Sequence, residues 1–297
     1  MGRAGPDRFG QPAPGWKRLR RRGYAAGSVH HRCRGDARQR GALPDSGPRV
    51  LIGRLLALLW LLAAAPLLAQ VPVAAAASLR YALDDAAAAY SKATGEQLRI
   101  SYAASGNLVQ QIEAGAPYQL FLSADEDHVF RLADNGLAPD RGRIYAVGRL
   151  VLIVPPGSPI NPSLAALKAG LASGQVKRLA IANPETAPYG ARSVEALKAV
   201  GLWAQAQPRL VTGENIAQAF QFVASGAADA GFTSLSLVKS PGFKGRYALV
   251  PANLHQPLTQ RMVLLKSATP AARRFHDWLL SPAGQALLAR HGYLPPA

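Results

Sequence analysis

The stretch LRISYAASGNLVQQIEAGAPYQLFL (98–122) has the pattern of a strand, a turn, a helix and a second strand. Its first part, LRISYA (98–103), is typical of a strand, and Leu108 and Ile112 lie one turn apart on the helix that follows. The apolar run at 120–122 forms the next strand. Two strands joined by a helix of this length predict a parallel pair in a sheet covered by helices.

The same alternation of short apolar strands and amphipathic helices continues over residues 71–297. The run RLVLIVPPGSP (149–159) is a strand closed by two prolines, where we expect the chain to cross into a second lobe. Further strands are predicted at 71–76, 179–181, 209–211, 230–233, 247–250 and 262–265, and helices in AARRFHDWLLS (271–281) and PAGQALLARHG (282–292).

The two C-terminal helices have apolar faces that need an existing sheet for burial, so we expect the chain to return to its first lobe. The sequence therefore predicts an α/β protein with two lobes, residues 71–149 plus 251–297 and residues 150–250. Each lobe is expected to have a central, mostly parallel sheet flanked by helices, with a ligand cleft between the lobes, because ligands of open α/β sheets bind at the carboxyl ends of the strands.

Positive charge is concentrated at the N-terminus. The formal net charge is +17, but 12 of the 34 Lys and Arg and only 3 of the 17 Asp and Glu lie in residues 1–49. Residues 70–297 keep a net charge of +7 without a basic run, which argues against nucleic-acid binding and is compatible with attracting small anions. Since the single cysteine is Cys33, a disulfide, thiolate metal site or cysteine nucleophile is excluded from residues 70–297.

Residues 50–69 are predicted to be a signal peptide. The apolar run LLALLWLLAAAPLLA (55–69) follows Arg54, is interrupted by Pro66 and is shorter than the roughly 20 residues that span a bilayer. We expect cleavage near Ala69, in preference to a buried core helix.

Residues 1–49 are rich in Arg, Gly and Pro and lack apolar periodicity, a composition typical of a disordered leader. Because the basic region of a signal peptide is short, one hypothesis is that translation starts near Val50. The alternative is a twin-arginine export signal at Arg20-Arg21-Arg22, although these lie far from the apolar run.

Four predicted strand-to-helix junctions have small or hydroxyl side chains and lack Lys and Arg at their tips. They are Ala76-Ala77-Ser78, Ala104-Ser105-Gly106, Pro188-Tyr189-Gly190 and Glu214-Asn215-Ile216. Each opens a helix, whose first turn has N–H groups without intrahelical partners and about half a positive charge. One such loop is an ordinary helix start, but four of them in both lobes predict an anion site without a side-chain cation.

Enzyme motifs are missing from the sequence. There is no G-x-S-x-G nucleophile elbow, no Walker loop and no dinucleotide glycine fingerprint. The histidines at 128, 255, 276 and 291 have no metal-ligand spacing, and Asp125-Glu126-Asp127 fits the acidic first turn of a helix better than a cation site. We therefore expect a protein that is not an enzyme and has no cofactor.

Four segments of the chain resemble the periplasmic molybdate-binding proteins of ABC importers, with their motifs in the same order across nearly all of residues 71–297. The segments are VPVAAAASLRYAL (71–83), ISYAASGNLVQQIEAGAPYQLFLSAD (100–125), LAIANPETAPYGARSVEAL (179–197) and WLLSPAGQALLARHGY (278–293). The resemblance implies a type II periplasmic binding-protein fold that holds a tetrahedral oxyanion, molybdate or tungstate, between its lobes. It also implies delivery to an ABC permease, and we expect a monomer, free in a Gram-negative periplasm because the signal junction has no lipid-anchoring cysteine.

The resemblance also implies the anion ligands. The hydroxyls of Ser78 and Ser105 and the backbone N–H groups of Tyr189 and Ile216 correspond to family ligands, and a fifth position falls on Ser234. Some relatives have a tyrosine at the fifth position, and a serine is shorter. Either Tyr189 supplies the missing hydroxyl or the site has one donor fewer.

The chemistry of the ion agrees with a cage made only of donors. Molybdate and tungstate are fully deprotonated dianions near neutral pH, so each oxygen accepts hydrogen bonds, whereas the proton of phosphate would face another donor. Sulfate passes that test and has to be excluded by size. The alternative functions are binding of another tetrahedral oxyanion such as sulfate, an exported hydrolase, and a nucleic-acid binder that uses residues 1–49.

Overall fold

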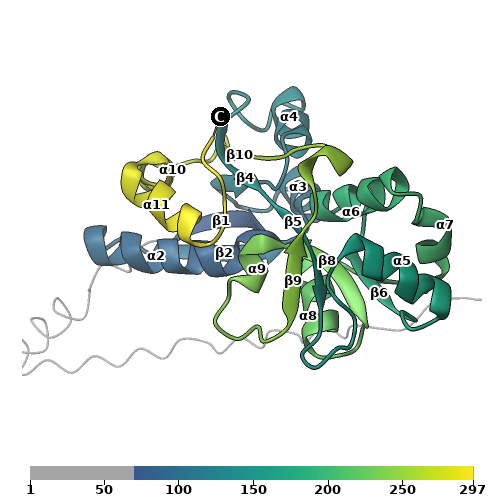
Figure 1. The fold of residues 1–297 in the computed structure, drawn as a ribbon. Helices are drawn as coiled ribbons and strands as arrows, with labels where there is room; N and C mark the ends of the chain where they lie inside the picture. The colour runs from purple at the N-terminus through teal and green to yellow at the C-terminus, as the bar shows by residue number, and fades with distance from the viewer. Residues whose placement is uncertain (1–69, 297) are drawn as a thin grey trace, which may run out of the picture. The chain divides into compact units, whose positions relative to one another are not determined.

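The computed structural model describes residues 70–296, so the predictions for the leader, the signal peptide and Cys33 lie outside the described residues. These residues form two lobes, each built on one five-stranded sheet (Figure 1). The first sheet has the order β2-β1-β3-β10-β4 and contains β1 (Val71–Ala76), β2 (Leu98–Ala103), β3 (Leu120–Leu122), β4 (Arg143–Gly148) and β10 (Leu258–Leu264). The second has the order β7-β6-β8-β5-β9 and contains β5 (Leu150–Val154), β6 (Leu179–Ala182), β7 (Leu210–Gly213), β8 (Ala230–Ser234) and β9 (Arg246–Leu249).

The two sheets follow the same plan. In the first, β1 pairs in parallel with β2 and β3, and β10 runs antiparallel to its neighbours β3 and β4. In the second, β6 pairs in parallel with β7 and β8, and β5 runs antiparallel to β8 and β9. The sheets are therefore mixed, with one reversed strand in each, and the predicted α/β fold with two lobes is confirmed.

The chain passes between the lobes twice. Arg149 alone separates β4 from β5, and residues 250–257, which include the 3-10 turn η3 (Ala252–Leu254), separate β9 from β10. A backbone bridge between Val147 and Leu294 fastens the C-terminal end to the first of these crossings. The short first crossing explains why β4 was not predicted, since no turn signal separates it from β5.

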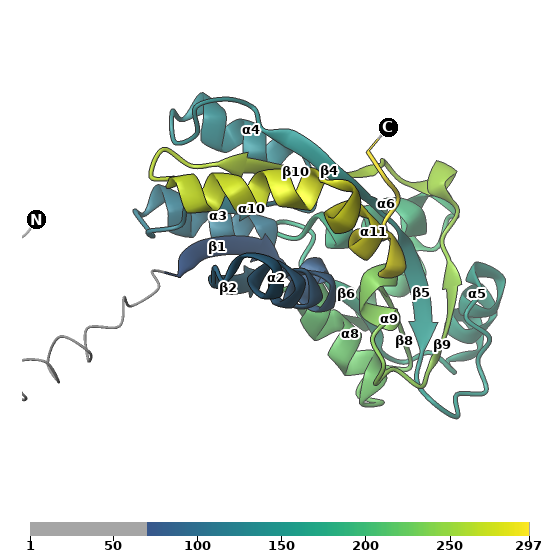
Figure 2. The ribbon, with the colours of Figure 1, turned by 90° about the vertical axis from the view of Figure 1, so that its left-hand side faces the viewer.

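Helices cover both faces of the first sheet. The helices α2 (Arg80–Thr94), α10 (Pro270–Leu280) and α11 (Pro282–Arg290) share a core with Val73 and Ala75, whereas α3 (Ser105–Glu113) and α4 (Asp127–Asp134) share one with Ala74. Neighbouring residues of a strand point to opposite faces, so β1 is buried on both sides. Figure 2 shows α10 in front of this sheet and α3 behind it.

The second sheet is surrounded by α5 (Leu164–Ser173), α6 (Pro188–Ala199), α7 (Trp203–Ala206), α8 (Ile216–Ala224) and α9 (Leu235–Val238). Its core is one apolar cluster that includes every residue of β5 and β6. Two further 3-10 turns are η1 (Ala77–Leu79), which follows β1, and η2 (Gln207–Arg209). At three of the four predicted junctions, those after β1, β2 and β7, the next helix or 3-10 turn begins within a few residues of the end of the strand. These helices and this turn therefore start near the edge of their sheet.

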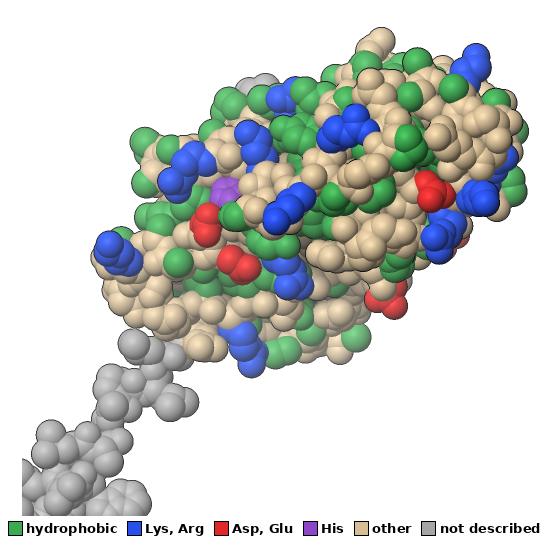
Figure 3. Space-filling model, turned by 60° about the horizontal axis from the view of Figure 1, so that its bottom comes forward, with side chains coloured by type: hydrophobic (Ala, Val, Ile, Leu, Met, Phe, Trp, Pro, Cys, Tyr) green, Lys and Arg blue, Asp and Glu red, His purple; other side chains and the backbone are tan. Residues whose placement is uncertain are grey.

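Charged side chains are mixed on the surface. On the face shown in Figure 3, Lys and Arg are scattered and do not gather into one basic patch. Five arginines form ion pairs with carboxylates in the described part of the chain: Arg131 with Glu113, Arg141 with Asp134, Arg192 with Glu195, Arg261 with Glu126, and Arg274 with Glu96. Among residues 70–296, no helix has the length and apolar character needed to cross a membrane.

Candidate functional site

The four predicted junctions meet at one small cavity between the lobes. Its walls are uncharged and consist of Ala76, Ala77, Ser78, Ala103, Ala104, Ser105, Ala124, Ala187, Pro188, Tyr189 and Ile216. The free space is about 10 Å³, room for roughly one water molecule. The lobes therefore lie close together here.

Ser78 has a buried hydroxyl that forms no hydrogen bond with any other described residue. It lies in η1, is 1% exposed, and its Oγ has no hydrogen-bond partner. A buried hydroxyl without a partner costs about 1–3 kcal/mol. A ligand that accepts this hydrogen bond would remove that cost.

Ser105 is held in place by the loop after β3. It is the first residue of α3, is fully buried, and its Oγ accepts a hydrogen bond of 3.1 Å from the N–H of Ala124. Because the hydroxyl oxygen is the acceptor in this bond, its proton remains free to donate into the cavity. The residue before the helix is Ala104, so no side chain caps the N–H groups of the first turn.

The second lobe presents backbone N–H groups. The helix α6 begins at Pro188 after Ala187, without a side-chain cap. In α8 the side chain of Asn215 accepts from the N–H groups of Ala217 and Gln218, which leaves the N–H of Ile216. Outside their own helices, no described residue accepts a hydrogen bond from the N–H of Tyr189 or Ile216. Three of the four junctions thus start a helix or 3-10 turn without a side-chain cap, and the second lobe keeps the N–H groups of Tyr189 and Ile216 without acceptors among the described residues outside their helices.

The phenol of Tyr189 reaches across to the first lobe. The side chain is 1% exposed, and its Oη accepts a hydrogen bond of 3.1 Å from Nε2 of Gln260 on β10. Burial raises the pKa of Tyr189 well above 10, so the phenol keeps its proton. Gln260 was not predicted from the sequence, and its position between Thr259 and Arg261 in the strand Leu258–Leu264 gives no local signal of burial.

Ser234 is buried but does not line the cavity. Its Oγ lies 2.9 Å from Oγ of Ser236, whose hydroxyl donates to the carbonyl of Ser78 over 2.6 Å. The hydroxyl of Tyr293 donates to the same carbonyl over 3.0 Å. Four of the five predicted ligands, Ser78, Ser105, Tyr189 and Ile216, are therefore brought together at the cavity, and Ser234 lies behind the backbone of Ser78.

A backbone hydrogen bond joins the lobes beside the cavity. The N–H of Gly106 in α3 donates to the carbonyl of Thr186 in the second lobe over 2.9 Å. A Cβ atom at Gly106 would lie 3.1 Å from both Cα and O of Thr186 and 3.0 Å from Nε2 of His128. The second lobe can approach this closely because residue 106 has no side chain.

The nearest carboxylate to the cavity wall along the chain, that of Asp125, is compensated by a histidine. Nδ1 of His128 lies 2.8 Å from both carboxylate oxygens, and the hydroxyl of Ser123 donates to one of them over 2.8 Å. Burial favours the neutral acid, but the hydrogen bonds from His128 and Ser123 hold the pKa of Asp125 below its usual value. Asp125 is therefore a hydrogen-bonded carboxylate one residue after Ala124 of the cavity wall.

The lowered pKa of Asp125 predicts how stability depends on pH. A carboxylate with a depressed pKa in the folded state stabilises the protein above its ordinary pKa of about 3.9, and this contribution is lost as pH falls through the lower folded value. We expect His128→Ala to reduce the free energy of unfolding at pH 5–6, and the difference from the wild type to shrink below about pH 4, where Asp125 becomes protonated. Urea titrations at pH 3 to 6 measure this; a difference that stays constant with pH would contradict it, and His255→Ala is the control.

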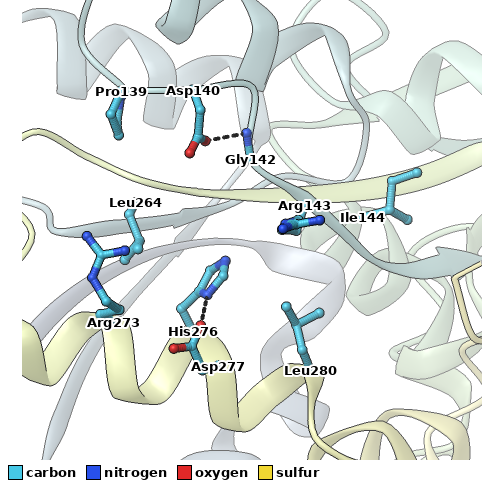
Figure 4. A pocket seen from close by; sticks show the side chains of 10 residues that line it. All are labelled: Pro139, Asp140, Gly142, Arg143, Ile144, Leu264, Arg273, His276, Asp277 and Leu280. Carbon is cyan, nitrogen blue, oxygen red and sulfur yellow. Dashed lines mark hydrogen bonds and ion pairs between the residues drawn. The ribbon is translucent and has the colours of Figure 1, made fainter.

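A second hollow, of about 500 Å³, lies on the first lobe between α10 and the loop before β4 (Figure 4). Arg143, Arg273 and His276 line it, but so do Asp140 and Asp277, and Nδ1 of His276 lies 2.7 Å from Oδ1 of Asp277. None of the predicted ligands is among its lining residues. Its mixed charges contrast with the uncharged cavity between the lobes.

The described residues contain no group of three or more His, Cys, Asp or Glu side chains that could hold a metal ion. Nor do the histidines meet one another. His128 and His276 contact the aspartates already named, His291 contacts Asp85, and His255 contacts a backbone carbonyl.

Comparisons with known proteins agree with this geometry. Residues 71–294 match the family model described as bacterial extracellular solute-binding protein. The molybdate-binding protein ModA of Azotobacter vinelandii is 38% identical over 238 residues, covering 78% of this chain and 93% of the relative, and ModA of Rhodobacter capsulatus is 34% identical over 229 residues, covering 76% and 88%. The solved structure of the Azotobacter vinelandii periplasmic molybdate-binding protein matches with a TM-score of 0.71 and 33% identity, over 77% of this chain and all of that one.

Two lobes that enclose a small donor-lined cavity define an extracellular solute-binding protein, and the chain belongs to that bacterial family. Within it, the identity to ModA proteins over most of both chains places it in the family of molybdate-binding proteins of ABC transporters, which confirms the resemblance found in the sequence.

Proposed function

We propose that this protein captures molybdate or tungstate in the periplasm and delivers the ion to an ABC permease. The observation that carries the proposal is the cavity wall, which offers hydroxyl and backbone donors from both lobes and contains no charged side chain. Within this wall, Ser78 gives the strongest support for the proposal, because the buried hydroxyl of Ser78 has no hydrogen-bond partner among the described residues.

The arrangement favours an ion that only accepts hydrogen bonds. The free protons of Ser78 and Ser105 come from the first lobe, and the N–H groups of Tyr189 and Ile216 come from the second. A protonated anion would bring a donor against a donor. The site therefore favours a fully deprotonated oxyanion over hydrogen phosphate.

Similarity supports the same ligand. The relatives with the identities given above are named molybdate-binding proteins, and the aligned regions include all four cavity loops. The sulfate-binding protein SubI of Mycobacterium tuberculosis shares the fold at 16% identity and a TM-score of 0.62, which says nothing of the ligand of this chain. Sulfate remains the alternative ligand, since it also lacks a proton.

The remaining parts of the proposal follow from solute binding. The protein acts without catalysis and without a cofactor, as a monomer, and the anion is its only metal-containing ligand. The ligand set is Ser78, Ser105, Tyr189 and Ile216, and Ser234 acts indirectly, through Ser236 and the carbonyl of Ser78. Export to the periplasm by the predicted signal peptide agrees with the description of the solved relative as a periplasmic protein.

Thermal unfolding of the purified protein tests the proposal. A ligand that binds only the folded state stabilises it by about 2.7 kcal/mol at a hundredfold excess over Kd. We expect molybdate and tungstate to raise the melting temperature by several degrees, and phosphate at the same concentration to leave it unchanged. No shift with molybdate or tungstate would refute the proposed function.

A further inference from the structure

Gln260 is an amide buried between the two lobes. It lies on β10 beside a register shift in the pairing of β10 with β4, and it is fully buried. Such irregularities redirect side chains and are frequent next to functional sites. A buried amide needs hydrogen-bond partners, and here both partners are tyrosines.

The amide connects Tyr145 of the first lobe with Tyr189 of the second. The hydroxyl of Tyr145 lies 2.7 Å from Oε1 of Gln260, and Nε2 of Gln260 lies 3.1 Å from Oη of Tyr189. Gly148 makes room for this contact, since a Cβ atom there would lie 2.2 Å from Oη of Tyr189 and 2.5 Å from Nε2 of Gln260. All three polar side chains are at most 1% exposed, so water cannot replace any of these bonds freely.

The direction of these bonds decides where the proton of Tyr189 goes. When Nε2 of Gln260 donates to Oη of Tyr189, the phenolic proton is left for another acceptor, and no described residue accepts it. Tyr189 lines the cavity together with Ser78, whose hydroxyl has no hydrogen-bond partner among the described residues. Burial raises the pKa of both Tyr145 and Tyr189 well above 10, so both phenols remain donors.

We propose that Gln260 is a positioning residue that sets the specificity of the anion site by turning the phenolic proton of Tyr189 toward the cavity. This inference rests on the proposed function and adds to it a fifth donor, held by a residue that does not touch the ligand. When Tyr145 donates to Oε1 of Gln260, Nε2 of the amide faces Tyr189, and the phenolic proton of Tyr189 is left to donate to the anion. A bound anion that carries a proton is then disfavoured.

The opposite orientation of the amide would have the opposite effect. Tyr145 also lies 2.9 Å from the carbonyl of Ser123, and if its proton went there, Gln260 could donate to Tyr145 and accept the proton of Tyr189. Tyr189 would then face the cavity as an acceptor and would tolerate a protonated anion. The two arrangements thus predict different preferences between molybdate and phosphate.

The test is a double-mutant cycle of Tyr189→Phe and Gln260→Met, with molybdate and phosphate titrated calorimetrically. Methionine keeps the approximate volume of glutamine but forms no such hydrogen bonds. We expect Tyr189→Phe to weaken molybdate binding by about tenfold or more, as for loss of a charge-assisted hydrogen bond. Gln260→Met should weaken it at least threefold and lower the ratio of molybdate to phosphate affinity, but should change affinity less than twofold when Phe already replaces Tyr189.

A Gln260→Met effect of equal size in both backgrounds, or an unchanged ratio of molybdate to phosphate affinity, would overturn the inference, because Gln260 would then be merely structural. Tyr118→Phe is the matched control, since its hydroxyl bonds only to exposed Gln111. If Gln260→Met fails to fold, Tyr145→Phe tests the same chain of bonds and should lower the same ratio. Failure of the wild type to bind molybdate would instead refute the proposed function.

Discussion

Replacing both Ser78 and Ser105 by alanine should weaken molybdate binding by roughly a hundredfold or more. Each hydroxyl is buried and has a free proton at the cavity. A hydrogen bond to a charged group contributes about 1.5–3 kcal/mol, and each 1.4 kcal/mol is about tenfold in Kd. The single Ser105→Ala variant should already lose about tenfold, and calorimetric titration measures both losses.

The fold should survive the double substitution. Alanine fills the same backbone space, and the hydroxyl of Ser78 has no partner among the described residues to leave behind. Loss of Ser105 Oγ leaves the buried N–H of Ala124 without its acceptor, which costs about 1–3 kcal/mol of stability. The matched control is Ser173→Ala with Ser225→Ala, because these two serines are exposed and lie outside the cavity. Equal molybdate affinity in the double variant and the control would remove both serines from the ligand set.

Replacing Gly106 by valine should weaken molybdate binding by at least tenfold without touching a ligand donor. The valine side chain would point at Thr186 of the other lobe, because a Cβ atom at residue 106 lies 3.1 Å from the Cα and O atoms of Thr186. The lobes would then stop short of full closure, and the donors of the second lobe would lie too far from the anion. Stopped-flow measurements should show the loss mainly as faster release, since most interface changes act on dissociation.

The control for this substitution is Gly242→Val, because no atom lies within 4 Å of a Cβ at Gly242. Both variants should melt near the wild-type temperature without ligand, whereas only Gly106→Val should lose the ligand-induced rise. An unchanged affinity of Gly106→Val would mean that the lobes do not meet at Thr186 in the bound state.

Much of the fold was predictable because the sequence signals are local. Apolar strands such as 71–76 and helices with apolar residues one turn apart, such as that with Leu108 and Ile112, are visible in a single chain. The strand β4 was not predicted, because only Arg149 separates it from β5. The helix α5 escaped because its apolar residues are not confined to one face, and only Leu167, Gly170 and Leu171 of its ten residues are buried.

The part of the site that is formed by the first residues of helices could be predicted from the sequence. Small residues at four junctions indicated where N–H groups would be exposed, and the cavity brings these junctions together. The part that was not predictable depends on contacts between distant segments. Gln260 meets Tyr189 across 71 positions of sequence, and Ser236 meets Ser78 across 158, and no local pattern encodes either pairing.

Parallel calorimetric titration of the wild-type protein with molybdate and sulfate is the most direct test of the central claim. Both ions are deprotonated, so the comparison isolates size and charge distribution from the proton-dependent exclusion of phosphate. We predict saturable binding of one molybdate per chain, at least a hundredfold tighter than sulfate. Equal affinities, or tighter binding of sulfate, would contradict the assignment of this cavity to molybdate.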